Sequence, residues 1–446
     1  MAKQLFGTDG IRGVAGEAPL DRATIFAFGA ALGADLTSRV ERPQVLIGAD
    51  TRESCQWIGD LVAGGLASHG VSVRYTGVIT TPGVAYLTRT TPFAAGVMIS
   101  ASHNPYQDNG LKVFSQSGFK LPDDEEHLVE QEIFRLIEKG VDPRPMSIQA
   151  DSGLTRHYLD FLRSTMRARL DGCRVAIDCG NGASYQLAPE LFRGLGAEVE
   201  AICCEPTGRN INLNCGALHL EALQQMVVAQ KADLGVAFDG DADRAIFVSA
   251  AGNVVNGDGV LLAAGRALKN AGHLPGDLVV TTVMANLGLE RALSECGIRM
   301  VRTPVGDKYV LEEMVRLGAA LGGEQSGHVI FREHATTGDG MLTALRVFEI
   351  AREAGVGLDE LTRDLKIYPQ RLVNVRVREK KGLLELPAVA SEIRRVEDAF
   401  GGAGRVLVRF SGTEPLARVM VEGPDLEQVE RFSASIADVI RREMGA

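Results

Sequence analysis

The chain has 446 residues, of which 45% are hydrophobic and 23% are charged, and its formal net charge is −10. This length exceeds what one hydrophobic core usually supports, so we expect about three globular domains and not a disordered chain. The net negative charge argues against a protein that binds nucleic acid or a membrane surface, because such proteins normally present a basic face.

Short apolar runs alternate with helix-like stretches along most of the chain, which is typical of βαβ units with largely parallel sheets. Three segments repeat one local pattern of strand, polar turn and helix, and they begin at Pro43, Arg174 and Asp277. This repetition favours three similar α/β domains, although any α/β chain can show such echoes. We place the domains at 1–150, 151–252, 253–367 and 368–446.

The last segment has a different pattern. Residues 370–378 alternate like a strand, and the apolar residues of 389–400 then fall on one helical face. Two short strands follow at 406–410 and 417–421, and an amphipathic helix spans the apolar positions of 426–440. The pattern predicts a small, separate α+β domain at the C-terminus.

The first polar cluster, residues 99–105, directly follows an apolar run and reads Ile-Ser-Ala-Ser-His-Asn-Pro. Open α/β sheets bind ligands beyond the carboxyl ends of their strands, so this loop is well placed for a ligand. The same residue types also suit an ordinary turn. Ser102 and His103 do not form a hydrolase pair, because adjacent side chains tend to point apart and no G-x-S-x-G motif surrounds the serine.

The second cluster places three carboxylates, Asp239, Asp241 and Asp243, at alternate positions between two apolar runs, with Arg244 directly after them. Carboxylates this close repel one another unless a hard cation neutralises them or solvent separates them. The loop lacks the glycine and glutamate that a calcium EF-hand requires at its sixth and twelfth positions. An oxygen-only set of ligands suits Mg²⁺, and three solvated surface aspartates are the alternative.

The third cluster, Gly322-Gly323-Glu324-Gln325-Ser326-Gly327-His328, combines flexible glycines with groups that can hydrogen-bond hydroxyls. Glu324 and Ser326 are candidates to bind a polyol, and His328 titrates near neutral pH. A polar loop with a structural histidine is the alternative interpretation.

The fourth cluster contains Arg409, Ser411, Gly412, Thr413 and Arg418 around a turn between two predicted strands. Backbone N–H groups, hydroxyls and guanidinium groups together form a suitable phosphate site. A hairpin turn with surface arginines is the alternative. No Walker-type G-x-x-x-x-G-K-[ST] motif or complete dinucleotide fingerprint occurs, so neither ATP nor NAD use is indicated.

The seven cysteines are scattered without metal-type C-x-x-C spacing, and reduced thiols in a cytoplasm explain them best. The N-terminus has no apolar core like that of a signal peptide, and no apolar run is long enough to span a membrane. We therefore expect a soluble, cytoplasmic protein.

Taken together, the four clusters resemble the α-D-phosphohexomutase superfamily, and within it the bacterial enzymes that act on glucosamine phosphates. The similarity extends along essentially the whole chain and includes the opening F-G-T-D-G-I-R-G at 6–13. The strings S-A-S-H-N-P, D-G-D-x-D-R, G-E-x-S-G-H and R-x-S-G-T-E-P carry it as a set. The F-G-T-D-G-I-R-G start, Gln325 and the stretch Asn214-Cys215-Gly216 favour glucosamine. Asn256, and Leu213 with Asn214, depart slightly from the usual pattern.

The resemblance implies a fold of four domains around a central cleft, three α/β and one smaller at the C-terminus. It implies a phosphorylated Ser102 and a Mg²⁺ ion held by Asp239, Asp241, Asp243 and a phosphate oxygen on Ser102. It implies that three cations surround the transferring group, namely Arg12, Lys112 and Arg244, and that Lys112 or His328 acts as acid or base. It implies that the sugar is bound by Glu324 and Ser326. The distal phosphate would be bound by the fourth cluster, which comprises Arg409, Ser411, Gly412, Thr413 and Arg418.

The implied activity is an isomerase that interconverts glucosamine 6-phosphate and glucosamine 1-phosphate through a glucosamine 1,6-bisphosphate, supplying precursors of amino-sugar nucleotides and the cell wall. Mutases of mannose or glucose phosphates are the alternative within the superfamily. The expected partner is a small sugar phosphate, with no nucleic acid and no membrane; the oligomeric state is open, with a homodimer as one candidate. Outside the superfamily, a phosphatase of the haloacid-dehalogenase type would use Asp239 as nucleophile, but Asp243 stands where that motif needs threonine or valine. A non-catalytic sugar-phosphate sensor has little reason to combine all four clusters.

Overall fold

The computed structural model describes residues 5–380, 382–383, 385–411 and 415–445. The chain forms two compact units, and each is described by itself. The first unit comprises Met1–Val283 with Met300–Arg363, and the second comprises Met284–Arg299 with Asp364–Ala446. No helix among the described residues combines the length and the apolar character needed to cross a membrane.

Three α/β sheets follow one another along the chain. The first has the order β1-β2-β6-β5-β3-β4, the second β11-β10-β9-β7-β8, and the third β13-β12-β14-β15. Their strands are β1 (Phe6–Gly7), β2 (Gly10–Val14), β3 (Gln44–Ala49), β4 (Ser72–Val78), β5 (Ala95–Ile99), β6 (Asp108–Ser115), β7 (Arg174–Asp178), β8 (Glu198–Ile202), β9 (Leu234–Phe238), β10 (Ala245–Ser249), β11 (Val254–Val255), β12 (Leu278–Thr282), β13 (Arg299–Thr303), β14 (Leu321–Gly323) and β15 (Val329–Phe331).

The three sheets share one strand order. β6-β5-β3-β4, β10-β9-β7-β8 and β15-β14-β12-β13 correspond strand by strand. Within each set of four, counted in chain order, the first strand pairs in parallel with the third, and the fourth pairs antiparallel to the third. The prediction of three similar α/β domains is confirmed. Each of the first three polar clusters occupies the same place, the hairpin loop between the third and fourth strands.

Helices separate the strands and cover the sheets, so β5 and β9 are buried at every position. The helices up to the C-terminal strands are α1 (Arg22–Arg39), α2 (Cys55–Ala67), α3 (Thr81–Thr90), α4 (Asp123–Lys139), α5 (Ser152–Thr165), α6 (Leu187–Gly194), η1 (Gly216–Leu218), α7 (Glu221–Gln230), α8 (Gly257–Asn270), η2 (Pro275–Asp277), α9 (Leu287–Glu295), α10 (Asp307–Leu317), α11 (Gly340–Ala354) and α12 (Leu358–Thr362).

Sequence signals explain where several of these helices begin. The side chain of Asp21 accepts hydrogen bonds from two N–H groups of the first turn of α1, and Asp339 caps α11 in the same way. Within the first domain, α1 and α2 pack closely because Gly29 has no side chain. A Cβ at Gly29 would lie 2.3 Å from the carbonyl oxygen of Val62.

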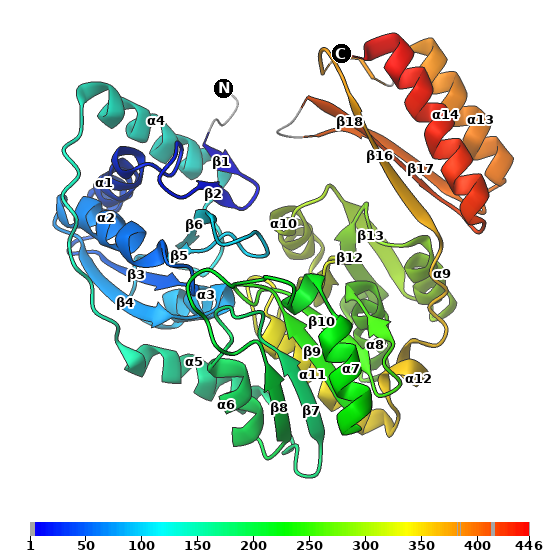
Figure 1. Ribbon diagram of the computed structural model, residues 1–446, viewed down its shortest axis with the longest axis horizontal. Helices are drawn as coiled ribbons and strands as arrows, with labels where there is room; N and C mark the ends of the chain where they lie inside the picture. Colours follow the sequence, from blue (N-terminus) through cyan, green and yellow to red (C-terminus); the bar gives the residue numbers. More distant parts are fainter. Residues whose placement is uncertain (1–4, 381, 384, 412–414, 446) are drawn as a thin grey trace. The chain divides into compact units, whose positions relative to one another are not determined.

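The second unit is built on a three-stranded antiparallel sheet with the order β16-β18-β17. Its strands are β16 (Gln370–Arg376), β17 (Arg405–Phe410) and β18 (Leu416–Glu422), and its helices α13 (Pro387–Phe400) and α14 (Leu426–Met444) pack side by side on the sheet (Figure 1). This order of elements confirms the predicted small α+β domain.

The helix α9 belongs to this second unit. The backbone N–H of Leu287 donates to Oε1 of Glu422 at 2.8 Å, and Nδ2 of Asn286 donates to the carbonyl oxygen of Tyr368 at 2.9 Å. The unit therefore includes a short segment from before β13. The domain limits proposed from the sequence stay predictions.

Candidate active site

Ser102 occupies the loop between β5 and β6, and only 1% of it is exposed. Its backbone is left-handed, with φ at +53°, which is unusual for a serine. Two side chains hold this conformation by donating to the carbonyl oxygen of Ser102: Nη2 of Arg52 at 3.1 Å and Nδ2 of Asn212 at 2.9 Å. The same two groups also bind the carbonyl oxygen of Asn104. The serine loop is thus clamped from two sides, as strained backbone at functional sites usually is.

The Ser102 hydroxyl faces the aspartate loop between β9 and β10. Its Oγ donates to Oδ2 of Asp239 at 2.5 Å, although the two residues are 137 positions apart. The loops approach this closely because residue 240 is glycine, where a Cβ would lie 2.4 Å from the carbonyl oxygen of Ser102. The structure therefore brings together the first two predicted clusters.

The three aspartates of this loop form a buried group of carboxylates. Asp239, Asp241 and Asp243 are exposed by 4% or less, and one oxygen of each lies within 4.8 Å of the others. Burial and the two neighbouring carboxylates raise the pKa of Asp239 to about 8. Oδ1 of Asp241 and Oδ1 of Asp243 are buried without a hydrogen-bond partner. Buried, unpaired carboxylate oxygens at this spacing fit a hard divalent cation.

Lys112, on β6, supplies positive charge to this group. Its Nζ lies 2.8 Å from Oδ2 of Asp241, 3.4 Å from Oδ2 of Asp243 and 3.0 Å from Oδ2 of Asp9. Burial opposes the charge on the ammonium group, but these carboxylates raise the pKa of Lys112 above its ordinary value. In this conformation the lysine is therefore a fixed cation.

Arg244 is a second buried cation at the end of the aspartate loop. Its backbone N–H donates to Oδ1 of Asp239 at 3.2 Å, and its Nη1 lies 3.1 Å from Nδ1 of His103. Burial, Arg244 and Arg12 lower the pKa of His103 to about 4, so its ring is neutral at neutral pH and Nδ1 can accept from the guanidinium group. Arg244 thus lies beside both the serine loop and the aspartate loop.

Arg12 reaches the site from β2 and is held by Asp9 in the preceding turn. Asp9 also binds Lys112 and Lys120, so one carboxylate links three cations. Burial would raise the pKa of Asp9, but Lys112, Lys120 and Arg12 hold it well below its ordinary value. Asp9 therefore orients the cations around the aspartate loop. Sequence analysis missed this residue, although it stands within the F-G-T-D-G-I-R-G string.

The third cluster lies against the base of the aspartate loop. Oγ of Ser326 donates to Oε2 of Glu324 at 3.5 Å, and the N–H of Gly306 donates to Oε1 of Glu324 at 3.3 Å. The N–H of Ala245 donates to the carbonyl oxygen of Gly327 at 3.1 Å. Glu324 and Ser326 are partly exposed, so their polar groups remain accessible to a ligand.

His328 ends this cluster and is almost completely buried. Its Nδ1 lies 3.6 Å from Oδ2 of Asp243, and its Nε2 accepts the N–H of Gly338 at 2.8 Å. Burial opposes protonation, whereas Asp243 and Asp307 raise the pKa of His328. The hydrogen bond from Gly338 requires an unprotonated Nε2, so we place one proton on the ring, at Nδ1 facing Asp243.

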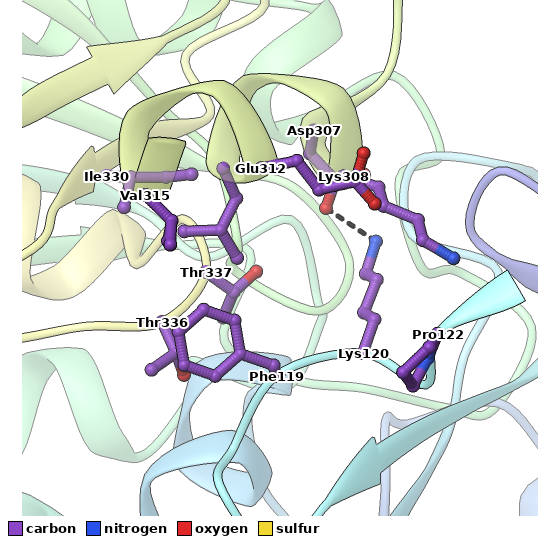
Figure 2. Close-up of a pocket in the computed structure, with 11 residues that line it drawn as sticks. Phe119, Lys120, Pro122, Asp307, Lys308, Glu312, Val315, Ile330, Thr336 and Thr337 are labelled. Atoms are coloured by element: carbon purple, nitrogen blue, oxygen red, sulfur yellow. Dashed lines mark hydrogen bonds and ion pairs between the residues drawn. The ribbon is translucent and has the colours of Figure 1, made fainter. Parts of the chain in front are cut away.

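A cavity of about 370 Å³ lies beside the site, between the loop after β6 and the helix α10. Figure 2 shows Lys120 pointing toward Asp307 at one end of this cavity, with Phe119 and Ile330 on its apolar side; the Nζ–Oδ2 distance is 2.5 Å. None of the three aspartates of the 239–243 loop lines it. Asp9 binds both Lys120, which lines the cavity, and Lys112, which contacts the aspartate loop.

The fourth cluster belongs to the second unit. Arg409 on β17 is the register partner of Arg418 on β18, and Nη2 of Arg418 donates to Oγ of Ser411 at 3.2 Å. Burial and the neighbouring Arg418 lower the pKa of Arg409. Two cations opposite each other on paired strands are unfavourable without an anion. Gly412 and Thr413 lie outside the described residues.

Sequence analysis also missed residues that act on the predicted ones. Thr81 donates through its hydroxyl to Oδ2 of Asp241, and its N–H donates to the carbonyl oxygen of Asp241 at 3.0 Å. Arg52 stands in the strand-turn-helix segment that begins at Pro43, so its position carried some signal. Asn212 and Thr81 carried none, because their partners are more than 100 residues away.

Four family models match consecutive parts of the chain. They describe phosphoglucomutase/phosphomannomutase α/β/α domain I at residues 3–139, domain II at 156–252, domain III at 256–368, and the C-terminal domain at 372–439. These matches cover all four polar clusters.

Individual proteins with names from this family are also similar to the chain, one in sequence and two in fold. A protein named phosphoglucosamine mutase from Solibacter usitatus is 79% identical over 445 residues, with 100% of both chains covered. The structure of a phosphoglucomutase/phosphomannomutase family protein from Burkholderia thailandensis superposes with a TM-score of 0.79 at 23% identity, over 98% of this chain and 97% of that one. An Aspergillus fumigatus N-acetylphosphoglucosamine mutase, in complex with GlcNAc-6P and magnesium, gives a TM-score of 0.67 at 17% identity, over 98% and 96%. The two structural similarities concern the fold.

Proposed function

The chain belongs to the phosphoglucomutase/phosphomannomutase family, within the α-D-phosphohexomutase superfamily, and we propose that Ser102 carries its transferable phosphoryl group. The activity is that of a phosphoglucosamine mutase, an isomerase that interconverts glucosamine 6-phosphate and glucosamine 1-phosphate. The observation that carries the role of Ser102 is its hydrogen bond to Asp239 across the two meeting loops, at 2.5 Å.

The reaction proceeds in two phosphoryl transfers. The phosphoryl group on Oγ of Ser102 passes to O1 of glucosamine 6-phosphate, which breaks the serine ester and forms glucosamine 1,6-bisphosphate. The bisphosphate then turns around, and its 6-phosphoryl group returns to Oγ of the same serine. Glucosamine 1-phosphate leaves, and the phosphoserine is restored without any external phosphate donor.

The protein contributes position and charge to these transfers, as phosphoryl transfer generally requires. Arg52 and Asn212 fix the serine backbone, so Oγ points toward the aspartate loop. Lys112, Arg244 and Arg12 surround this point with positive charge, and they stabilise the charge that develops on the transferring oxygens. Because all three are held by carboxylates, little reorganisation accompanies the transfer.

Mg²⁺ is the cation that we propose for the aspartate loop. Asp239, Asp241 and Asp243 would hold it, together with a phosphate oxygen on Ser102, because oxygen ligands suit this ion. The two buried Oδ1 atoms that have no hydrogen-bond partner, those of Asp241 and Asp243, support this assignment. When bound, the ion supplies Lewis-acid stabilisation of phosphate oxygens.

Lys112 is the stronger candidate for the acid or base. His328 already uses Nε2 to accept the N–H of Gly338, and its Nδ1 faces Asp243. Lys112 carries its protons on Nζ and is held as a cation by the carboxylates around it. We therefore propose that Lys112 exchanges the proton with the sugar hydroxyl and that His328 orients Asp243.

The substrate is bound by the remaining two clusters in this proposal. Glu324 and Ser326 present partly exposed oxygens that can bind sugar hydroxyls. The distal phosphate is assigned to the fourth cluster, which comprises Arg409, Ser411, Gly412, Thr413 and Arg418. The opposed positions of Arg409 and Arg418 on the paired strands support an anion site there.

A cytoplasmic location is supported by the seven cysteines, all of which are free thiols in the structure. A homodimer stays a prediction that light scattering on the purified chain would test.

The test follows both the reaction and the serine. The chain is incubated with glucosamine 6-phosphate and Mg²⁺, and ³¹P NMR detects the 1-phosphate; glucose and mannose 6-phosphates are compared in the same assay. Peptide mapping by mass spectrometry should place an acid-stable phosphate on Ser102. Ser102→Ala should abolish both signals, whereas Ser117→Ala, on the exposed surface of the same domain, should retain both. Turnover near the wild-type rate in Ser102→Ala would exclude the proposed role.

A further inference from the structure

A second group of potential metal ligands lies in the same domain as the aspartate loop. Asp178 is the last residue of β7, Cys203 directly follows β8, and Cys215 precedes η1. One ligand atom of each lies within 4.8 Å of the other two. These atoms converge because β7 and β8 are parallel neighbours, so their carboxyl ends meet at one edge of the sheet.

The two thiols of this group are hydrogen-bonded to each other. This hydrogen bond lowers the pKa of Cys215 and raises that of Cys203, so it is the convergence of the three ligand atoms that indicates a metal site. Cys203 has a left-handed backbone, with φ at +52°, a conformation in which glycine would be more stable. The adjacent Cys204 uses its thiol elsewhere, in a hydrogen bond with Cys179.

The carboxylate of the group is already oriented. Oδ1 of Asp178 accepts the N–H of Gly180 at 2.8 Å, and Oδ2 accepts the N–H of Gly216 at 2.9 Å. Each oxygen keeps a further lone pair, and such outer hydrogen bonds are typical of metal-binding carboxylates. In a tetrahedral zinc site with bonds of about 2.3 Å, ligand atoms lie about 3.7 Å apart, which small side-chain shifts would reach here.

We propose that Asp178, Cys203 and Cys215 form a second cation site, which binds one Zn²⁺ ion and leaves its fourth position to water. Two thiolates and one carboxylate select a softer ion than the three carboxylates of the aspartate loop, so Mg²⁺ does not compete for this site. The two proposed metal sites of the domain thus select different ions, because their ligands differ.

Hydrogen bonds connect this site to the serine loop. The N–H of Asn212 donates to the carbonyl oxygen of Gly180 at 2.8 Å, and the Asn212 side chain holds the carbonyl oxygen of Ser102. Gly180 and Gly216 both donate to Asp178, the carboxylate of the site. A bound ion would therefore join Asp178, which accepts the N–H of Gly180, to Cys215, which follows Asn212 in the same segment.

The experiment titrates Co²⁺, a spectroscopic substitute for Zn²⁺, into the reduced full-length chain in the presence of excess Mg²⁺. A thiolate-to-cobalt charge-transfer band should appear and saturate at one equivalent, and one equivalent of Zn²⁺ should remove it. Carboxylates alone give no such band, so metal bound at the aspartate loop is not counted. Zn²⁺ should also raise the melting temperature, because it binds the folded chain.

Cys203→Gly is the decisive variant, because it removes one ligand and relieves the left-handed backbone. We expect its affinity for Co²⁺ to fall at least about 100-fold and its melting temperature to stop responding to Zn²⁺. Cys204→Ala is the matched control and should bind Co²⁺ like the wild type. The proposal is wrong if the wild type gives no band, if Cys203→Gly keeps it, or if Cys204→Ala loses it equally.

Discussion

The aspartate loop of the first unit and the arginine pair of the second unit both concentrate like charges, but they differ in burial. Asp239, Asp241 and Asp243 are buried and already have Lys112 in contact. Arg409 and Arg418 face each other on paired strands, and both are partly exposed.

This difference indicates two functions. A buried group of carboxylates among fixed cations is arranged for a charge that changes during the reaction, since charges there are weakly screened by water. A partly exposed pair of arginines is suited to hold an anion whose charge stays constant. Changes at the aspartate loop should therefore affect kcat and the metal requirement, and changes at the arginine pair should affect KM.

The largest effect is expected from Asp239→Asn. This change replaces one carboxylate of the proposed metal-binding group, the one that accepts the Ser102 hydroxyl, by a weaker amide ligand. Metal ions contribute several kcal/mol to transition-state stabilisation, so kcat should fall about 10³-fold and the Mg²⁺ concentration for half-maximal activity should rise. Steady-state kinetics over a Mg²⁺ series measures both.

The matched control is Asp233→Asn, an exposed aspartate just before β9 whose side chain only accepts the N–H of Arg174. It should change kcat less than twofold. An unaltered Mg²⁺ dependence in Asp239→Asn would remove this carboxylate from the proposed metal site.

The next largest effect distinguishes the proposed role of Lys112 from that of His328. Lys112→Met keeps much of the buried chain volume, and kcat should fall about 10²-fold with loss of one limb of the pH–rate profile. His328→Gln should lower kcat less but keep the shape of the profile, because His328 orients Asp243 in our proposal. Thermal unfolding checks that both variants are folded. If His328→Gln alone loses the limb, the roles are reversed.

The sequence predicted the fold well because each domain carries local signals of its strands and helices. The apolar run 234–238 coincides with β9, and the alternation from Gln370 coincides with the start of β16. The carboxylate spacing at 239–243 was likewise sufficient to indicate a cation site. Such signals lie within a few residues of one another, so composition and periodicity reveal them.

The supporting contacts could not be predicted in the same way. Thr81, at the start of α3, meets Asp241, and Asn212, between β8 and η1, meets Ser102, only because the first two domains pack together. Asp9 stands in the F-G-T-D-G-I-R-G string, but nothing in that string shows that it contacts three cations. The convergence of Asp178, Cys203 and Cys215 was missed for the same reason, since their spacing follows no C-x-x-C pattern.

At the arginine pair, Arg418→Gln should change binding more than catalysis. It removes one guanidinium donor from the proposed distal phosphate site, so KM for glucosamine 6-phosphate should rise about 10- to 30-fold, while kcat changes less than threefold. Arg394→Gln, on the exposed face of α13 in the same unit, should leave both constants unchanged. A large fall in kcat at constant KM would contradict the division between the two regions.

The smallest effect concerns the clamp on the serine loop. Asn212 has φ at +58°, so Asn212→Gly removes its side chain without straining the backbone. Loss of the hydrogen bonds to the carbonyl oxygens of Ser102 and Asn104 should loosen the serine, and about 1 kcal/mol of lost positioning lowers kcat about fivefold. The matched variant Asn210→Gly removes contacts to Glu205 and Thr207 on the same segment and should lower kcat less than twofold. Equal losses in both variants would mean that the segment acts as a whole, and that Asn212 does not position Ser102 through these two hydrogen bonds.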